Sequence, residues 1–401
     1  MWDILEGLQH WLEIDLDKLA ANLREIKGSL GDCGLIAVVK NDAYGFGAPE
    51  CARTFMQAGA DILAVTTLEE ALELREAEIG APVLVFLPPM PGEERLYAEY
   101  RLTATVDSLR AARLLREYGQ NTGQELQCHL KVNCGMNRFG VNPGAELAAV
   151  LEELAQPGAP VLLGVYAHMA TALEPEEKFA REQIRLFNQV REQVLDCGGL
   201  TEAQKELICF HLANSAGGLR FPEARFSAVR MGSALYGQLL MAKKMGLNLQ
   251  EPFVAKARIS AIRNLKKGDG VGYSQEYHAG KAQRLAVIPY GYGDGFGVSA
   301  QARELTVRES VQTMSRNIGK LVLGRGQRGV YYQDKLLPVL GRVAMQSMMV
   351  DIGDLPLEVG DEVSVPLRRT AASARLPRVY LEGGRPVSLR VLTSRSLSRE
   401  V

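Results

Sequence analysis

The sequence has neither an excess of one charge nor a long apolar run. Lysine and arginine number 46 and aspartate and glutamate 47, which gives a formal net charge of −1. No stretch gathers basic residues into a stripe that could neutralise many phosphates, so we expect no nucleic-acid partner. No run of about 18 apolar residues occurs, and the acidic first residues lack a basic start followed by an apolar block. We therefore expect no membrane contact and a cytoplasmic protein.

Cysteines and aromatic residues are also few. The six cysteines form no Cys-x-x-Cys pair and have no neighbouring His-x3-His, so the sequence predicts reduced thiols, with neither a metal site nor a disulfide framework. Aromatic residues make up 6% of the 401 residues and hydrophobic residues 47%. This composition is typical of a globular protein with at least one large core, and the length allows two domains or a barrel with an appendage.

From about residue 34 to residue 240, short β-branched runs alternate with segments of helical period, the pattern of parallel strands joined by crossover helices. The predicted strands cover 35–39, 62–66, 83–86, 103–106, 127–133, 161–168, 207–212 and 226–230. The predicted helices cover 49–58, 68–78, 108–118, 145–154 and 175–195, the last with acids in its first turn. Eight strand–helix units in roughly 200–250 residues indicate an α/β fold of the TIM-type (β/α)8 barrel class. A doubly wound sheet is the alternative, but a glycine-rich dinucleotide fingerprint after the first strand is missing.

After about residue 251 the pattern changes to short runs separated by Gly/Asp turns, such as KKGDGVGY and GDEVSVPL. These runs predict a mostly β C-terminal domain. We place the barrel domain at 12–245 and the β domain at 246–401, with an N-terminal strand at 1–11 as a candidate member of the β domain. The polar segment 300–319 interrupts the β pattern and is predicted to be a helical or loose insertion.

In a barrel of this kind, the residues just past each strand face one shared cavity. The polar residues at these positions are Lys40, Tyr44, Arg138, His168, Asn214, Ser215, Arg230, Gly232 and Ser233. Two guanidinium groups and the loops of the last two units favour a phosphate site. A desolvated lysine near other cations becomes a nucleophile toward an aldehyde. Lysine, phosphate and guanidinium together indicate pyridoxal 5′-phosphate (PLP).

The motifs that contain these residues resemble those of the alanine racemase family. AVVKNDAYGFG resembles the family's PLP-lysine motif and KVNCGMNRFG its arginine motif, and HLANSAG, VRMGSALYG, GVGYSQEY, IPYGYGDG and GRVAMQSMMVD match further family blocks in order. The resemblance covers nearly the whole chain. It implies a fold-type III PLP-dependent amino-acid racemase with a small amino-acid substrate, working as a homodimer with shared active sites.

The resemblance implies two proton-transferring residues. Lys40 would hold PLP as a Schiff base and act as the base on one face of the substrate, and Tyr273 would act on the other face, reaching into the partner subunit's barrel. Two groups are needed because inverting a stereocentre removes the α-proton on one side and returns it on the other. Unperturbed pKa values are about 10.4 for lysine and about 10 for tyrosine, so both pKa values need to be lowered by nearby positive charge, which Arg138 and Arg230 supply.

The resemblance also implies the binding contacts. Arg230 would donate to the pyridine nitrogen, keeping it unprotonated, and His168 would bond Arg230 and tune Tyr273. Arg138 would contact the PLP phenolate oxygen and the substrate carboxylate, with Lys131 behind it, free or as a carbamate. The other implied contacts are Tyr44, Ser215, Gly232 and Ser233 at the phosphate, Asn214 among the cofactor-binding residues, Tyr292 at the substrate's approach, and the backbone N–H of Met345 at its carboxylate.

Two departures from the family pattern bear on the substrate. Gln346 stands where the family usually carries an aspartate, and the short segment 364–374 has no counterpart to a tyrosine that touches the phosphate and narrows the pocket. The stretch 300–330 is also longer than usual. The expected function is alanine racemisation that supplies D-alanine for peptidoglycan, and the alternative is a racemase of serine or a larger amino acid. A PLP-dependent decarboxylase would need an acid at the pyridine nitrogen and a glycine-triplet phosphate loop, and a non-catalytic PLP carrier would leave the β domain unexplained.

Overall fold

The computed structural model describes residues 5–239, 241–298, 328–367 and 372–391. The chain divides into two compact units: a barrel unit, Leu16–Pro252, and a β unit formed by Met1–Asp15 with Phe253–Val401. The division thus falls after Pro252, and the N-terminal segment belongs to the β unit. Among the described residues, no helix combines the length and apolarity needed to cross a bilayer. The insertion predicted at 300–319 lies outside the described residues.

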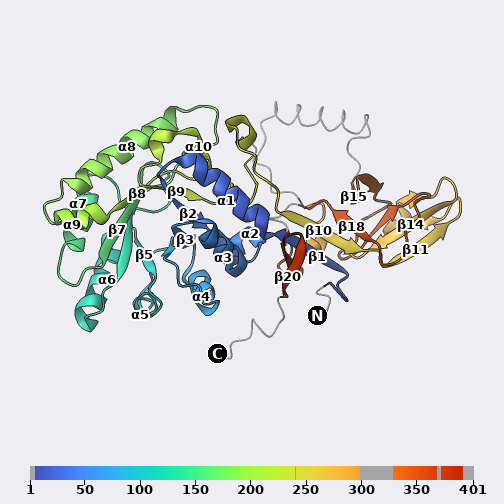
Figure 1. Ribbon diagram of the computed structural model, residues 1–401, viewed down its shortest axis with the longest axis horizontal. Coiled ribbons are helices and arrows are strands. Elements are labelled where there is room, and N and C mark those ends of the chain that lie inside the picture. The colour runs from blue at the N-terminus through green and yellow to red at the C-terminus, as the bar shows by residue number, and fades with distance from the viewer. Residues whose placement is uncertain (1–4, 240, 299–327, 368–371, 392–401) are drawn as a thin grey trace. The chain divides into compact units, whose positions relative to one another are not determined.

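Eight parallel strands form the sheet of the barrel unit, in the order β8-β7-β6-β5-β4-β3-β2-β9, which confirms the predicted fold (Figure 1). Their bounds are β2 Gly34–Val38, β3 Ile62–Val65, β4 Val83–Val85, β5 Thr103–Val106, β6 Gln127–Lys131, β7 Val161–Tyr166, β8 Cys209–His211 and β9 Ala228–Met231. Hydrogen bonds from Ser227 N–H to Phe210 O (2.9 Å) and from Arg230 N–H to Ala213 O (3.0 Å) join the two outer strands. The ring is therefore nearly closed.

Apolar strand residues fill the barrel, as the near-continuous hydrophobic runs predict. One buried cluster draws on four neighbouring strands and consists of Ile36, Val38, Ala64, Leu84 and Ala228. Because these side chains hold the strands together from inside, the polar residues that follow the strands are left to surround the open end of the barrel.

Helices connect the strands and lie around the outside of the barrel (Figure 1). Their bounds are α1 Leu16–Leu30, α2 Lys40–Gly45, α3 Ala48–Ala58, α4 Leu68–Glu76, α5 Glu94–Glu99, α6 Leu109–Thr122, α7 Ala145–Leu154, α8 Lys178–Leu195, α9 Glu202–Leu207, α10 Ser215–Arg220, and the 3-10 helices η1 Pro222–Ala224 and η2 Ala242–Met245. The helix predicted at 175–195 begins only at Lys178, so the acids predicted for its first turn precede it. The reason is tertiary: Arg220 binds the Ala172 and Glu174 carbonyls and the Glu177 carboxylate.

The described residues of the β unit form three sheets, ordered β16-β15-β18-β10-β1-β19-β20, β11-β14-β17 and β12-β13. The bounds are β1 His10–Asp15, β10 Phe253–Arg258, β11 Ala261–Leu265, β12 Gly270–Val271, η3 Tyr273–Gln275, β13 Tyr277–His278, β14 Gln283–Ile288, η4 Tyr292–Asp294, β15 Gly329–Tyr332, β16 Lys335–Pro338, β17 Met348–Asp351, β18 Glu362–Val365, β19 Arg378–Glu382 and β20 Arg385–Arg390. Strand β1 pairs antiparallel with β10 and parallel with β19. This pairing is why the N-terminal segment belongs here.

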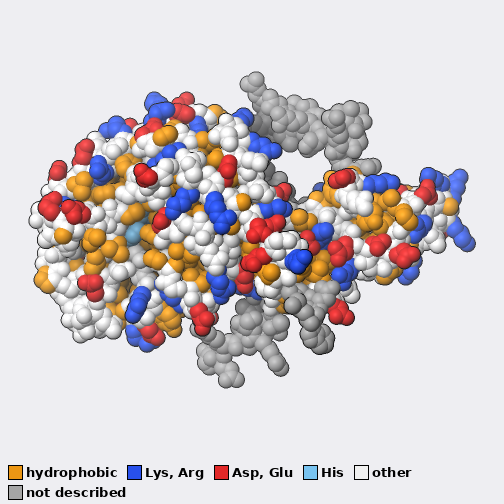
Figure 2. Space-filling view, viewed as in Figure 1, with side chains coloured by type: hydrophobic (Ala, Val, Ile, Leu, Met, Phe, Trp, Pro, Cys, Tyr) orange, Lys and Arg blue, Asp and Glu red, His pale blue; other side chains and the backbone are white. Residues whose placement is uncertain are grey.

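Charged side chains of both signs are interspersed over the face of each unit that Figure 2 shows, with apolar side chains between them. That face therefore carries no broad patch of a single charge.

Candidate active site

A cavity of about 300 Å³ lies in the barrel unit, at the carboxyl ends of its strands. The nine residues predicted at the strand ends all line it: Lys40, Tyr44, Arg138, His168, Asn214, Ser215, Arg230, Gly232 and Ser233. Lys131 also lines it, and no aspartate or glutamate of the described chain does. Four cationic side chains without a lining carboxylate make this a site for an anionic ligand.

Lys40 begins α2, which is a left-handed turn rather than a regular α-helix. The four residues Asn41 to Tyr44 all have φ between 51° and 58°, a region that L-residues avoid at a cost of roughly 1–2 kcal/mol per residue. Ala43 N–H donates to Val39 O (2.8 Å), and Gly47 N–H donates to Asp42 O (3.0 Å). The Asp42 carboxylate also accepts the Ala48 N–H at 2.9 Å. These bonds hold a strained turn that directs Lys40 and Tyr44 to the same cavity.

Glu70, which the sequence reasoning did not single out, ties this turn to the next strand. One carboxylate oxygen accepts the Asn41 N–H at 2.5 Å, and the other accepts the N–H groups of Thr66 (2.7 Å) and Thr67 (3.2 Å). The Thr67 hydroxyl in turn accepts the Glu70 N–H at 3.3 Å, which completes a capping box at the start of α4. The Thr-x-x-Glu spacing is a sequence signal that would have found it.

Burial and nearby charges lower the pKa of Lys40. Burial is the largest cause and the positive charge of Arg138 the second, while Glu70 acts in the opposite direction. Lys131 is more extreme: it is 8% exposed, and its ammonium lies 4.1 Å from the centre of the Tyr166 ring. Burial, Arg230 and Arg138 hold the pKa of Lys131 well below its usual value.

The two terminal nitrogens of the Arg230 guanidinium, Nη1 and Nη2, hold the side chain in place through hydrogen bonds. Nη1 lies 2.7 Å from His211 Nδ1 and donates to His211 O at 2.9 Å. Nη2 donates to Ala167 O (2.6 Å) and Leu212 O (2.9 Å), and lies 3.3 Å from His168 Nδ1. Within the described chain, this leaves the Nε–H without a partner. Burial lowers the pKa of Arg230 to about 10, so the guanidinium stays charged at neutral pH and can offer one N–H to a ligand.

His168 lies near the same cationic side chains. It lies against Arg230, and its pKa is held well below the usual value by burial first and then by Arg230, Lys131, Arg138 and Lys40. The imidazole is therefore neutral at pH 7. His211, the last residue of β8, was not predicted as a site residue, but it is the closer histidine partner of Arg230.

The small polar residues cluster on one side of the cavity. Ser215 Oγ accepts the Gly232 N–H at 3.0 Å, and a Cβ at position 232 would collide with the Tyr44 hydroxyl. The Asn214 side chain accepts the Gly217 N–H at 3.0 Å as the N-cap of α10. Hydroxyls and a close backbone approach suit a phosphate, and an amine beside guanidinium groups suits an aldehyde, so the residues present fit PLP.

Three predicted site residues lie in the β unit and do not line the cavity of the described chain. Tyr273, Tyr292 and Met345 are 67%, 51% and 58% exposed. Tyr292 and Met345 are neighbours, because Gly293 N–H donates to Met345 O at 2.8 Å and Tyr292 N–H to Ala344 O at 3.1 Å. Tyr273 begins the short helix η3.

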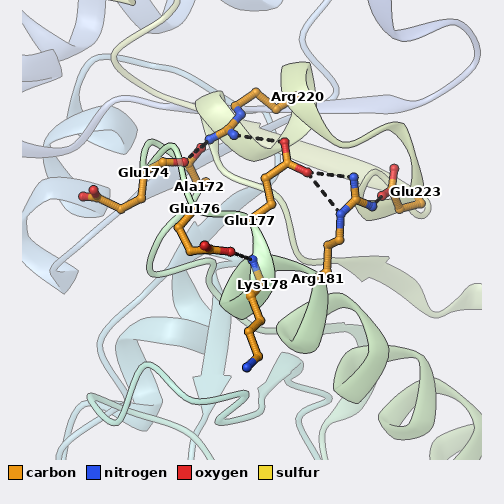
Figure 3. Close-up of polar contacts among 8 residues, drawn as sticks. All are labelled: Ala172, Glu174, Glu176, Glu177, Lys178, Arg181, Arg220 and Glu223. Carbon is orange, nitrogen blue, oxygen red and sulfur yellow. Dashed lines mark hydrogen bonds and ion pairs between the residues drawn. The ribbon is translucent and has the colours of Figure 1, made fainter.

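Hydrogen bonds and ion pairs hold the segment 172–177 (Figure 3). Arg220 donates to the carbonyls of Ala172 (2.6 Å) and Glu174 (2.7 Å), and Glu177 joins Arg220 to Arg181 at 3.2 Å and 2.8 Å. Leu173, between the two bound carbonyls, lines the cavity and is 66% exposed. These contacts therefore place the apolar side chain of Leu173 against the cavity, at a position that no sequence motif indicated.

Comparison with known proteins gives one consistent family. The model of the alanine racemase N-terminal domain matches residues 14–239, and that of the alanine racemase C-terminal domain matches residues 253–375. The alanine racemase of Clostridium tetani is 30% identical over 407 residues, covering 95% of this chain and 97% of that protein, and that of Symbiobacterium thermophilum is 35% identical over 364 residues, covering 90% and 88%.

Solved structures agree in fold. The alanine racemase of Clostridium difficile 630 superposes with a TM-score of 0.82 at 27% identity, covering 96% of this chain and 99% of that one. A histidine racemase from Leuconostoc mesenteroides shares the fold, with a TM-score of 0.76 at 24% identity, covering 94% and 99%.

Proposed function

The chain belongs to the alanine racemase family of PLP-dependent isomerases, and from this premise we propose that it interconverts L- and D-alanine through two proton-transferring residues, Lys40 and Tyr273. The observation that carries the proposal is the cavity of the barrel unit, where an amine of lowered pKa and three further cations surround one anion-sized space. D-alanine for peptidoglycan, made in the cytoplasm, is the proposed use of the product.

PLP, when bound, would withdraw electrons from the substrate Cα and acidify its proton. Arg230 would hold the pyridine nitrogen with its Nε–H, which has no partner in the described chain. Because the guanidinium stays charged at neutral pH, it would keep that nitrogen unprotonated. Tyr44, Ser215, Gly232 and Ser233 would hold the phosphate. Arg138 would bind the substrate carboxylate, with Lys131 behind it as an amine or a carbamate.

Proton transfer at Cα needs one group on each face. The Lys40 amine accepts a proton only when neutral, and burial together with Arg138 favours that form. For the opposite face we propose Tyr273 of the partner subunit, in a head-to-tail homodimer, since the exposed phenol is accessible to a second chain. Met345 and Tyr292, exposed in the same unit, would meet the substrate there.

The test combines chirality with isotope exchange. Purified protein with PLP and L-alanine in D₂O is expected to yield D-alanine deuterated at Cα, measured by chiral chromatography and mass spectrometry. Lys40→Ala is expected to abolish both conversion and exchange. Tyr273→Phe should stop conversion while Lys40 still exchanges the α-proton of one enantiomer. Racemisation by either variant at the rate of the wild type would contradict the two-base proposal.

A second candidate is a racemase of serine or a larger amino acid. Two features favour it: Gln346 in place of an aspartate, and the short segment 364–374 without the pocket-narrowing tyrosine. The same chromatography with a panel of L-amino acids decides between them. If kcat/KM is higher for serine than for alanine, serine and not alanine is the preferred substrate.

A further inference from the structure

A buried chain of hydrogen bonds continues from Arg230 into the centre of the barrel. Arg230 Nη1 lies 2.7 Å from His211 Nδ1, and His211 Nε2 lies 2.9 Å from His129 Nδ1. His211 is fully buried and His129 is 3% exposed. The chain thus links β9, β8 and β6, and of its three side chains only Arg230 lines the cavity.

The chemistry of the first donor fixes the proton on each ring. A guanidinium only donates, so His211 Nδ1 accepts and carries no proton. A neutral His211 then holds its proton on Nε2 and donates it to His129 Nδ1, which leaves the His129 proton on its own Nε2. Burial and the Arg230 charge, which lower the pKa of His129 to about 3 and that of His211 well below its usual value, keep both rings neutral.

His211 is also held in orientation. Its ring stacks on Tyr166 at 4.9 Å between centres and 2° between planes. Thr105 Oγ1 donates to Val85 O at 2.6 Å, so the Tyr166 hydroxyl, 2.8 Å away, donates to Thr105 Oγ1. The stack fixes where the His211 ring lies but not which nitrogen is protonated. Arg230 requires an unprotonated Nδ1, and His129 provides the acceptor for the proton on Nε2.

The backbone is shaped around His129. The register of β6 and β7 shifts at this residue, because Cys128 pairs with Leu162 whereas His129 pairs with Gly164. Such a bulge re-aims a side chain. A Cβ on Gly164 would lie 2.7 Å from His129 Cε1 and Nδ1, so only glycine leaves room for the ring.

We propose that His129 is a positioning residue that selects the tautomer of His211 and thereby holds the Arg230 guanidinium in place for the cofactor. The last step rests on the proposed function, because only a PLP enzyme needs Arg230 at a pyridine nitrogen. Without an acceptor at His129, His211 can carry its proton on Nδ1, where it would face another donor on Arg230. The guanidinium then loses its hydrogen bond to His211 Nδ1, and its orientation toward the cofactor changes.

The tautomer is tested without any activity measurement. The chain has five histidines, so ¹⁵N-histidine labelling of the full-length protein as purified gives a spectrum that single substitutions can assign. We expect His211 with Nε2 protonated and Nδ1 unprotonated in the wild type. In His129→Phe, which keeps a ring but has no acceptor, we expect the Nδ1-protonated form to appear. A wild-type His211 protonated on Nδ1 would overturn the proposal.

Catalysis is then compared across three variants. We expect His129→Phe to lower kcat about tenfold, or about 1.4 kcal/mol, with a smaller change in KM. His129→Gln, whose amide oxygen can accept from His211, should recover most of the loss. Gly164→Ala, which substitutes no histidine but would displace the His129 ring, should repeat the defect. Equal losses in the Phe and Gln variants would reduce His129 to a packing role. A wild type without racemase activity would refute the proposed function and leave the tautomer result standing.

Discussion

At the scale of single residues, the absence of a side chain at position 232 leaves room for Tyr44 in the proposed cofactor site. A Cβ there would collide with the Tyr44 hydroxyl and approach its Cζ to 3.1 Å. We predict that Gly232→Ala displaces the phenol and weakens PLP binding about tenfold, the loss of roughly one hydrogen bond of about 1.4 kcal/mol. Titration of the apoenzyme with PLP measures this. Gly28→Ala in α1, where a Cβ meets nothing within 4 Å, is the matched control and should leave PLP affinity unchanged.

A second residue-scale prediction concerns the charge of Glu70. Glu70 raises the pKa of Lys40 against the lowering by burial and Arg138, so Glu70→Gln should lower that pKa further. Since only the unprotonated amine attacks an aldehyde, the pH at half-maximal rate of PLP recombination with the apoenzyme should move down. The neighbouring exposed carboxylate offers the control Glu69→Gln, which should not move it. An upward shift in Glu70→Gln would contradict the electrostatic argument.

At the scale of elements, the left-handed turn after β2 depends on Asp42. This residue has φ 51° and its carboxylate binds the first N–H of α3. We predict that Asp42→Ala, which loses the acceptor and tolerates left-handed φ poorly, lowers the free energy of unfolding by about 1–2 kcal/mol. Asp42→Asn keeps both properties and should lose less. Urea unfolding followed by circular dichroism compares the two, and equal losses would show that neither the bond nor the conformation matters.

The elements also show what the sequence could and could not reveal. The eight barrel strands were predictable because short, largely apolar runs alternate with segments of helical period, and the residues after them were predictable because parallel strands end together. The start of α8 was not, because the acids at 174–177 suit a helix N-terminus locally but are held by Arg220 from α10. His129 and His211 were missed because they lie inside the predicted strands 127–133 and 207–212, and only the register of β6, β7 and β8 brings them to Arg230.

At the scale of the whole molecule, the candidate catalytic residues are distributed over two units. Lys40 lines the cavity of Leu16–Pro252, whereas Tyr273, Tyr292 and Met345 are exposed on the unit that contains Phe253–Val401. If each active site takes the barrel of one subunit and the β unit of the other, a C2 dimer has two sites of mixed origin. Two inactive variants could then repair one another.

We predict this repair for Lys40→Ala mixed with Tyr273→Phe. When equal amounts of the two variants exchange subunits, half of the dimers are mixed, and each mixed dimer has one site with both Lys40 and Tyr273 and one site with neither. The expected activity is about a quarter of the wild type, measured as D-alanine formed after unfolding and joint refolding. The control is each variant refolded alone, which should stay inactive. No recovery in the mixture, with mixed dimers verified by mass, would show that the two residues do not act across subunits, since a site within one chain can never regain both.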